Sequence, residues 1–143
     1  QGEYKKAEEL YEKSLRISER ALGEEHPDTA VGYHNLAGVY ERQGEYKKAE
    51  ELYEKSLRIR ERALGEEHPD TAMSYHNMAE LYFLQGNYEF ALAYFIKAYK
   101  ILMNKLGIEH PNTKICYQNM EIAYAKWKPE GGFEQWLEDK LSF

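Results

Sequence analysis

Residues that carry special chemistry are scarce in this sequence. Its single cysteine, Cys116, cannot form an internal disulfide, so the sequence favours a reducing compartment and we expect a cytoplasmic protein. No apolar run approaches the roughly 20 residues that a membrane-spanning helix needs. A membrane partner is therefore not expected.

Basic charge is also scarce. The 19 lysines and arginines are outnumbered by 25 aspartates and glutamates, which gives a formal net charge of −6. Acidic and basic residues are interleaved along the chain, so we expect no basic patch of the kind that binds a phosphate backbone. The sequence therefore predicts no nucleic-acid partner.

The sequence shows none of the usual catalytic patterns. It has no nucleophile paired with a base, no glycine-rich phosphate loop and no cysteine–histidine spacing typical of a metal site. The stretch "PEGGFE" near the end is a turn, too short and too acidic to hold a phosphate. We therefore predict that these residues carry out no catalysis and bind no cofactor or metal.

The dominant feature is a repeat of 42 residues. "QGEYKKAEELYEKSLRI" begins at Gln1 and again at Gln43, and "QGNYEFALAYFIKAYKI" begins at Gln85. Units 1–42 and 43–84 differ at only eight positions. Such near-identity predicts a repeat architecture in which neighbouring units pack against one another.

Each unit has the pattern of two amphipathic helices. Apolar residues recur at three- and four-residue steps from Tyr4 to Ile17 and again from Val31 to Tyr40, with charged residues on the other face. "RQG" ends the second stretch, and its Gly44 permits a sharp turn. No segment alternates with the two-residue period of a strand, so we predict an all-α fold of stacked antiparallel helix pairs. The expected helices span residues 3–22, 28–42, 45–64, 70–84, 87–106 and 112–126.

A histidine-containing string joins the helices of successive units. "GEEHPDTA" at 23–30 returns at 65–72 and, as "GIEHPNTK", at 107–114. Histidine and carboxylates can ligate a metal, but adjacent residues of a loop point in different directions. The structural alternative, which we favour, has Pro27 in the first helical turn and Asp28 and Thr29 accepting its free N–H groups. His26, which precedes the proline, is expected to be extended.

The helix pairs resemble the tetratricopeptide repeat (TPR). In "YHNLAGVYERQGEYKKAEELYEKSL" a first helix, helix A, carries an N-L-A/G-x-x-Y core, and a second, helix B, carries a small residue, an aromatic and another small residue. The usual TPR period is 34 residues; the 42-residue form is similar to the repeats of kinesin light chains and of many bacterial arrays. The resemblance implies a right-handed superhelical solenoid. The matching positions are Asn35, Leu36, Ala37, Tyr40, Gly44, Tyr46, Ala49, Tyr53 and Ser56.

The repeat frame also divides the chain. Residues 1–126 hold TPR-like repeats with frames starting at 1, 43 and 85, and the first helix is a helix B without its helix A. Residues 127–143 hold a breaker, "KWKPEGG", and a divergent C-terminal helix that we expect to cap the array. Because the chain starts in mid-repeat, we expect it to be a segment of a longer array.

The resemblance implies a binding surface on helix A, which lines the concave face of TPR arrays. Seven of the eight differences between the first two units lie on helix A, which fits a variable binding wall, although drift beside an atypical last repeat would also produce them. By resemblance, asparagines of this face hold a peptide backbone and histidines lie beside them; a purely structural polar stripe is the alternative. The predicted concave-face residues are Val31, His34, Asn35, Glu41, Arg42, Met73, His76, Asn77, Glu80, Phe83, Leu84, Ile115, Gln118 and Asn119.

A second set of residues is apolar where earlier repeats are charged. In the third unit Leu92, Ile96 and Met103 form a stripe on helix B that should be covered. "FEQWLEDKLSF" offers an apolar face as the cover, although Trp136 stands where the repeat favours a small residue, so it cannot dock as the earlier helices B do. The alternative is docking on a neighbouring molecule. The predicted cap or self-association residues are Phe90, Leu92, Ile96, Met103, Phe133, Trp136, Leu137 and Leu141.

Three functions are compatible with these patterns. We favour a protein–protein interaction scaffold that binds a peptide or partner domain and has no catalysis of its own, because the period, the helix-A variation and the missing catalytic groups agree. A structural array that self-associates through its open ends, end to end or by swapping, is the second. A regulatory repeat segment of a larger enzyme is the third.

Overall fold

The computed structural model describes residues 2–142, and within them every regular element is an α-helix. The all-α prediction is therefore confirmed, and the six predicted helix ranges agree with the structure to within one residue at each end. A seventh helix follows the breaker. The helices are α1 (Gly2–Leu22), α2 (Pro27–Arg42), α3 (Tyr46–Leu64), α4 (Pro69–Leu84), α5 (Tyr88–Leu106), α6 (Pro111–Trp127) and α7 (Phe133–Leu141).

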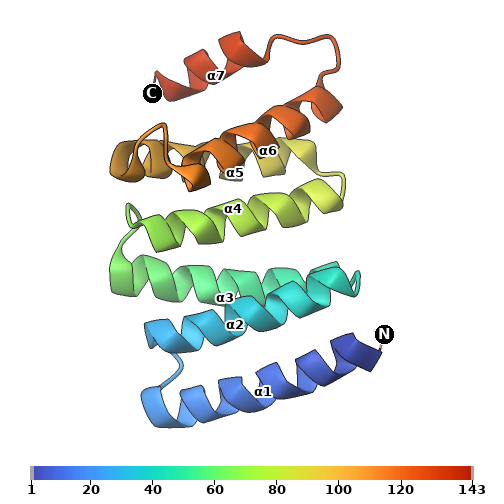
Figure 1. The fold of residues 1–143 in the computed structure, drawn as a ribbon, viewed down its shortest axis with the longest axis vertical. Helices are drawn as coiled ribbons and strands as arrows, with labels where there is room; N and C mark the ends of the chain where they lie inside the picture. Colours follow the sequence, from blue (N-terminus) through green and yellow to red (C-terminus); the bar gives the residue numbers. More distant parts are fainter. Residues whose placement is uncertain (1, 143) are drawn as a thin grey trace. The chain divides into compact units, whose positions relative to one another are not determined.

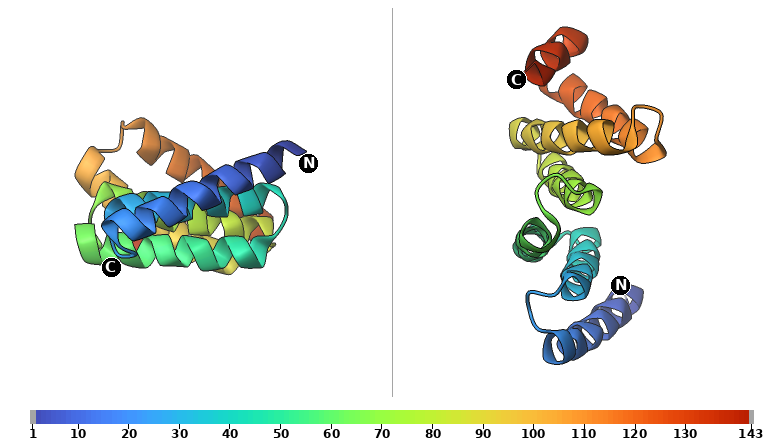
Figure 2. Two further views of the ribbon diagram at one scale, coloured as in Figure 1. Left: turned by 90° about the horizontal axis from the view of Figure 1, so that it is seen from below. Right: turned by 90° about the vertical axis from the view of Figure 1, so that its left-hand side faces the viewer.

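The helices form two compact units, residues 1–66 and 67–143. In the first unit α2 lies between α1 and α3 and packs against both (Figure 1). In the second unit α5 packs against α4 and α6, and the short α7 lies against α5 and α6 (Figures 1 and 2). Within each unit, consecutive helices run antiparallel, as short connections require.

Small residues allow the helices of a pair to approach closely. Ala30 and Ala37 are seven residues apart, lie on one face of α2 and are fully buried. Ala49 and Ser56 of α3 are fully buried as well. Large side chains fill the space beside these contacts. In the first unit Leu15, Ala30, Tyr33, Leu36 and Ile59 form one buried cluster.

The opposite face of α2 meets α1. A Cβ atom at Gly32 would lie 3.0 Å from Cδ1 of Leu15, so a larger side chain here requires Leu15 to shift by a few tenths of an ångström. The Tyr33 hydroxyl donates a hydrogen bond of 2.6 Å to Glu19 of α1. One helix A therefore has two packed faces, one for each neighbouring helix B.

Helix A is joined to the next helix B by a tight glycine turn. Gly44 has φ +80°, its N–H donates to the carbonyl of Glu41, and the N–H of Glu45 donates to the carbonyl of Tyr40. These two bonds satisfy carbonyls left free at the end of α2. The same pattern recurs after α4, where Gly86 has φ +78°.

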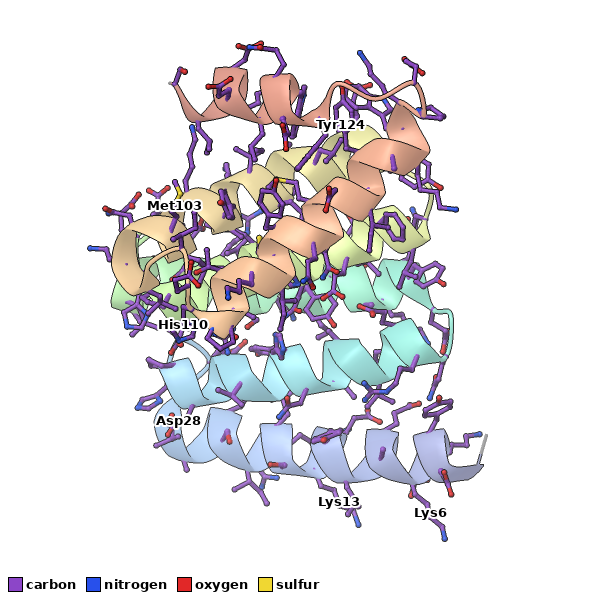
Figure 3. All side chains as sticks on the ribbon, turned by 45° about the horizontal axis from the view of Figure 1, so that its top comes forward. Lys6, Lys13, Asp28, Met103, His110 and Tyr124 are labelled. Atoms are coloured by element: carbon purple, nitrogen blue, oxygen red, sulfur yellow. The ribbon has the colours of Figure 1, made fainter. Side chains whose placement is uncertain are left out.

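The repeated histidines are helix caps. His26, His68 and His110 stand immediately before α2, α4 and α6 in extended conformation, each followed by the proline that starts the helix. Figure 3 labels His110 at the start of α6. The Nδ1 atoms of the three histidines accept the backbone N–H two residues later, at 3.0, 3.0 and 3.1 Å. The extended conformation was predicted, but the capping role of the ring was not.

One detail of the predicted connection is wrong. We expected the Thr29 side chain to accept a free N–H group of α2, but its hydroxyl donates to the carbonyl of Gly23 at 2.7 Å. Thr29 is fully buried, so it ties the end of α1 to the start of α2 from inside the joint. The acceptor role belongs to His26 instead.

The described residues contain no cluster of three histidine, cysteine, aspartate or glutamate side chains that could hold a metal ion.

The capping bond of His26 can be tested by substitution. His26→Ala removes the acceptor for the Asp28 N–H and should lower the free energy of unfolding by about 1 kcal/mol, whereas His26→Asn supplies another acceptor and should restore most of the loss. Urea denaturation followed by circular dichroism measures both, with Glu24→Ala as a control in the same loop. Equal stability of His26→Ala and the original chain would contradict the capping role.

Candidate functional site

In the second unit, the two helices A meet at a buried histidine. Nε2 of His76 in α4 lies 3.2 Å from Nδ2 of Asn119 in α6 and 3.3 Å from Oε1 of Glu80. The imidazole ring also contacts the Phe95 ring edge-on, at 5.3 Å between centroids. Only 4% of His76 is exposed, and its ring links α4, α5 and α6 in this structure.

One ring nitrogen of His76 lacks a hydrogen bond. No hydrogen-bond partner among the described residues reaches its buried Nδ1. Nε2 accepts from Asn119 Nδ2 in one tautomer of the ring and donates to Glu80 Oε1 in the other, so the two contacts are alternatives. Asn119 keeps its own side-chain oxygen for another donor.

The equivalent position in the first unit, His34, is set against a different ring. Its imidazole packs edge-on against Tyr53 of α3 at 5.4 Å, and the Tyr53 hydroxyl donates to Glu41 at 3.1 Å. Desolvation by burial, with a smaller contribution from the positive charge of Arg60, lowers the pKa of His34 to about 4. His34 is therefore neutral at physiological pH.

Several exposed residues of the predicted helix-A surface are apolar. Ile115 in α6 is 49% exposed, and Val31 and Leu84 are similarly open. Ile122, seven residues after Ile115, is 52% exposed and was missed. The signal was present in the sequence, because residues seven apart lie on one face of a helix.

The other predicted residues of this surface are placed as follows. Phe83 is half-buried, and its ring packs against Tyr88 of α5 at 5.5 Å. Glu41 takes part in the Tyr53 hydrogen bond described above. Of the remainder, Arg42 and Gln118 are exposed, whereas Asn35, Met73, Asn77, Glu80 and Asn119 are half-buried.

The residues predicted for a cap gather around α7. Leu92 and Ile96 of α5 are buried, and they line a pocket of about 360 Å³ together with Trp127 and Trp136. The rings of Phe133 and Trp136 both contact Tyr124 of α6, at 5.5 and 5.2 Å between centroids. Figure 3 shows Tyr124 beneath α7. Leu137 is buried, and Met103 and Leu141 are half-buried.

Phe90 does not belong with this group. It is 56% exposed, and its ring lies edge-on against Tyr82 at 5.5 Å. With Ala93, Tyr94 and Lys97 it lines a separate shallow pocket on α5. We grouped Phe90 with Leu92 and Ile96 because all three are apolar where the earlier repeats are charged. In the structure, Phe90 lies on a different side of α5 from the other two.

Cys116 is a buried packing residue. Its thiol donates to the carbonyl of Phe95 at 3.5 Å, and burial, followed by the negative charge of Glu80, raises its pKa to about 12. It occupies the position of Gly32 in the first unit, where the structure leaves little room. A catalytic thiol would need the opposite shift.

Antiparallel helix pairs that recur every 42 residues, with small residues at the helix contacts, define a helical-repeat protein. The family model "Tetratricopeptide repeat" matches residues 1–62, 32–104 and 70–128. The chain belongs to the tetratricopeptide-repeat family. A search among curated proteins gave no significant match.

Solved structures give the same fold. BtubC (BKLC) from P. vanneervenii superposes with a TM-score of 0.78 and 28% sequence identity, over 89% of this chain and 50% of that one. The nearly identical TPR-like repeats of a candidate kinesin light chain from Podosopora anserina superpose with a TM-score of 0.79 and 30% identity, over 87% of this chain and 59% of that one. The chain thus spans only 50% and 59% of these two proteins.

Membership of this family sets the broad functional class. TPR folds are generally scaffolds for protein–protein interaction and are typically non-catalytic. None of the helices in the part of the chain that the structure describes is long and apolar enough to cross a membrane.

The low pKa of His34 predicts an acid-sensitive contribution to stability. Because the unfolded chain binds a proton near pH 6.5 and folded His34 only near pH 4, the stabilisation is complete above pH 6.5 and is lost as the pH falls from there toward 4. His34→Gln, which copies Gln118 of the third unit, should remove this component. Urea denaturation at several pH values tests it, and equal pH slopes for both chains would contradict it.

Trp136 should carry much of the contact between α7 and α5. Trp136→Ala would expose Leu92 and Ile96 and should lower the stability of the second unit by roughly 2 kcal/mol, less than for a fully buried tryptophan because Trp136 is half-buried. Thermal and urea unfolding measure the loss. Glu138→Ala, on the exposed side of α7, is the control, and a loss no larger than in that control would contradict the assignment.

Proposed function

We propose that this chain is a protein–protein interaction scaffold whose helix-A surface binds an extended peptide or a partner domain. The repeats of residues 1–126 form the scaffold, and residues 127–143 cap it. A cytoplasmic location is supported by Cys116, since a single buried free thiol suits a reducing compartment.

The observation that carries the proposal is the pair of exposed isoleucines on α6. Ile115 and Ile122 are separated by two helical turns, about 10.5 Å along the axis. Two isoleucines exposed on one face of α6 form an apolar strip that a partner can cover. They flank Asn119, which His76 holds in place.

This arrangement fits an extended peptide. In polyproline II conformation, residues i and i+3 point to the same side about 9 Å apart, close to the spacing of the two isoleucines. Two apolar side chains three residues apart can therefore pack on Ile115 and Ile122. The free oxygen of the Asn119 amide can accept a backbone N–H from the peptide between them.

A peptide display library selected on the immobilised chain tests the proposal. Selected peptides should bind the double variant Ile115→Asp, Ile122→Asp roughly tenfold more weakly or worse, since each apolar contact is replaced by a charge. They should bind Ile108→Asp normally, because Ile108 is equally exposed but lies in the loop before α6.

Two results count against the proposal. One is a selection that yields no peptides. The other is a set of peptides that tolerate both aspartates on α6, because the binding surface then lies elsewhere on the chain.

A further inference from the structure

The cavity between α5 and α7 is walled by the two tryptophans of the sequence. Trp127, at the end of α6, and Trp136 of α7 line it together with Leu92 and Ile96 of α5, and its volume is about 360 Å³. Leu92 and Ile96 are buried, whereas both tryptophans are half-buried. Small-molecule sites have volumes of roughly 300–1,000 Å³. The cavity is therefore large enough for a small ligand.

Tyr124 of α6 holds both tryptophans in position. Its ring contacts Trp127 at 5.8 Å and Trp136 at 5.2 Å between centroids. Its hydroxyl donates to the carbonyl of Gly131, in the turn before α7, at 3.3 Å. Tyr124, which Figure 3 labels, is itself only 5% exposed. The aromatic walls of the cavity are thus fixed by contacts within the protein, which lowers the cost of ordering them around a ligand.

The apolar lining is specific to the third repeat. In the first unit, Glu8 and Gln43 stand at the positions of Leu92 and Trp127, and a hydrogen bond of 3.4 Å joins them. A polar pair that faces across two helices has thus become an apolar pair at the same place. Because both sides change together, the cavity is a feature of this repeat rather than a gap common to all of them.

The rim of the cavity carries two opposite charges. Glu89, at the start of α5, and Lys140, near the end of α7, are exposed and line the cavity. Neither of them forms an ion pair with another residue that the structure describes. Glu89 stands where the earlier repeats have Lys5 and Lys47, so the sign of the charge is reversed here. A carboxylate and an ammonium group are therefore available at the mouth of an apolar cavity.

These charges favour one class of ligand. A ligand that carries only a carboxylate is attracted by Lys140 but repelled by Glu89, and a ligand that carries only an amine meets the reverse. A zwitterion pairs with both groups and is repelled by neither. The two indole rings favour an aromatic side chain, whose ring can stack on them or pack edge-on against them.

We propose that the cavity between α5 and α7 binds a free aromatic amino acid. The side chain packs between Trp127 and Trp136, the α-ammonium group binds Glu89, and the α-carboxylate binds Lys140. This site is separate from the isoleucine pair on α6 and does not depend on peptide binding there.

L-Phenylalanine is the probe for the experiment, because it does not absorb where tryptophan is excited. Both tryptophans line the cavity, so their emission reports on it directly. Titration of the whole chain should give a saturable change in emission with a Kd of about 1 mM or lower. Isothermal titration calorimetry should give one ligand per chain.

Three analogues with the same phenyl ring test the role of charge. Phenethylamine lacks the carboxylate, hydrocinnamate lacks the ammonium group, and N-acetyl-phenylalaninamide lacks both, as an internal peptide residue does. Each should bind roughly tenfold more weakly than L-phenylalanine. Equal binding of the amide would mean that a peptide side chain occupies the cavity, which overturns the proposal.

Two variants test the rim residues. Glu89→Gln and Lys140→Gln keep the length of each side chain and should each weaken L-phenylalanine binding roughly fivefold, since both groups are exposed. Glu89→Gln should also strengthen hydrocinnamate binding, and Lys140→Gln should strengthen phenethylamine binding, because each variant removes the repelling charge. Glu138→Gln, on the exposed side of α7, is the control and should change neither.

Three further outcomes would overturn the proposal. The first is an emission that does not saturate with L-phenylalanine. The second is equal affinity for L-phenylalanine and the two singly charged analogues, since the cavity then takes an apolar ring without regard to charge. The third is an affinity for L-phenylalanine that neither Glu89→Gln nor Lys140→Gln changes.

Discussion

The close approach of helix A and helix B at small side chains governs the packing of this molecule. Ala30 and Ala37 meet α3, and their equivalents Ala72 and Ala79 are also fully buried. With the backbones this close, the aromatic side chains beside the alanines reach across to the neighbouring helix and bury most of their area. In α6 the charged residues Lys114 and Glu121 replace the two alanines, and no described helix packs on them as α3 packs on α2. The α7 helix then packs on Tyr124 and on α5, and those charges stay exposed.

The connections impose a second constraint, because they orient each helix A before it packs. A histidine ring caps the helix, a proline fixes its first turn, and a buried threonine closes the joint in the first unit. The same ring type performs two other roles in helix A, since His34 is a desolvated neutral ring and His76 links α4 to α6. The five histidines of the sequence thus serve packing and capping, which explains why a motif rich in histidine and carboxylates need not be a reactive site.

The sequence alone predicted the helices, the repeat and the family, because these follow from apolar periodicity and from a pattern that recurs in register. The sequence did not predict that the His26 ring caps α2, since sequence spacing does not show which acceptor reaches a given backbone N–H. Nor did it separate Phe90 from Ile96, because both depart from the repeat but point to different sides of α5. The burial of His76 depends on contacts with α5 and α6, which no local pattern reports. Ile122 could have been found, since it lies one heptad after Ile115.

The near-identity of α1 and α3 also has a kinetic consequence. While the chain folds, both helices offer α2 the same alanine, serine and isoleucine surface, so α2 can pair with either at nearly equal free energy. Within residues 2–22 and 44–64, Ser18 and Arg60 are the only side chains that distinguish the two partners; the rest of the distinction comes from the connections, above all the three-residue turn at Gly44 that brings α3 back along α2. A chain whose interfaces are this alike therefore depends on its turns to avoid trapped, wrongly paired intermediates.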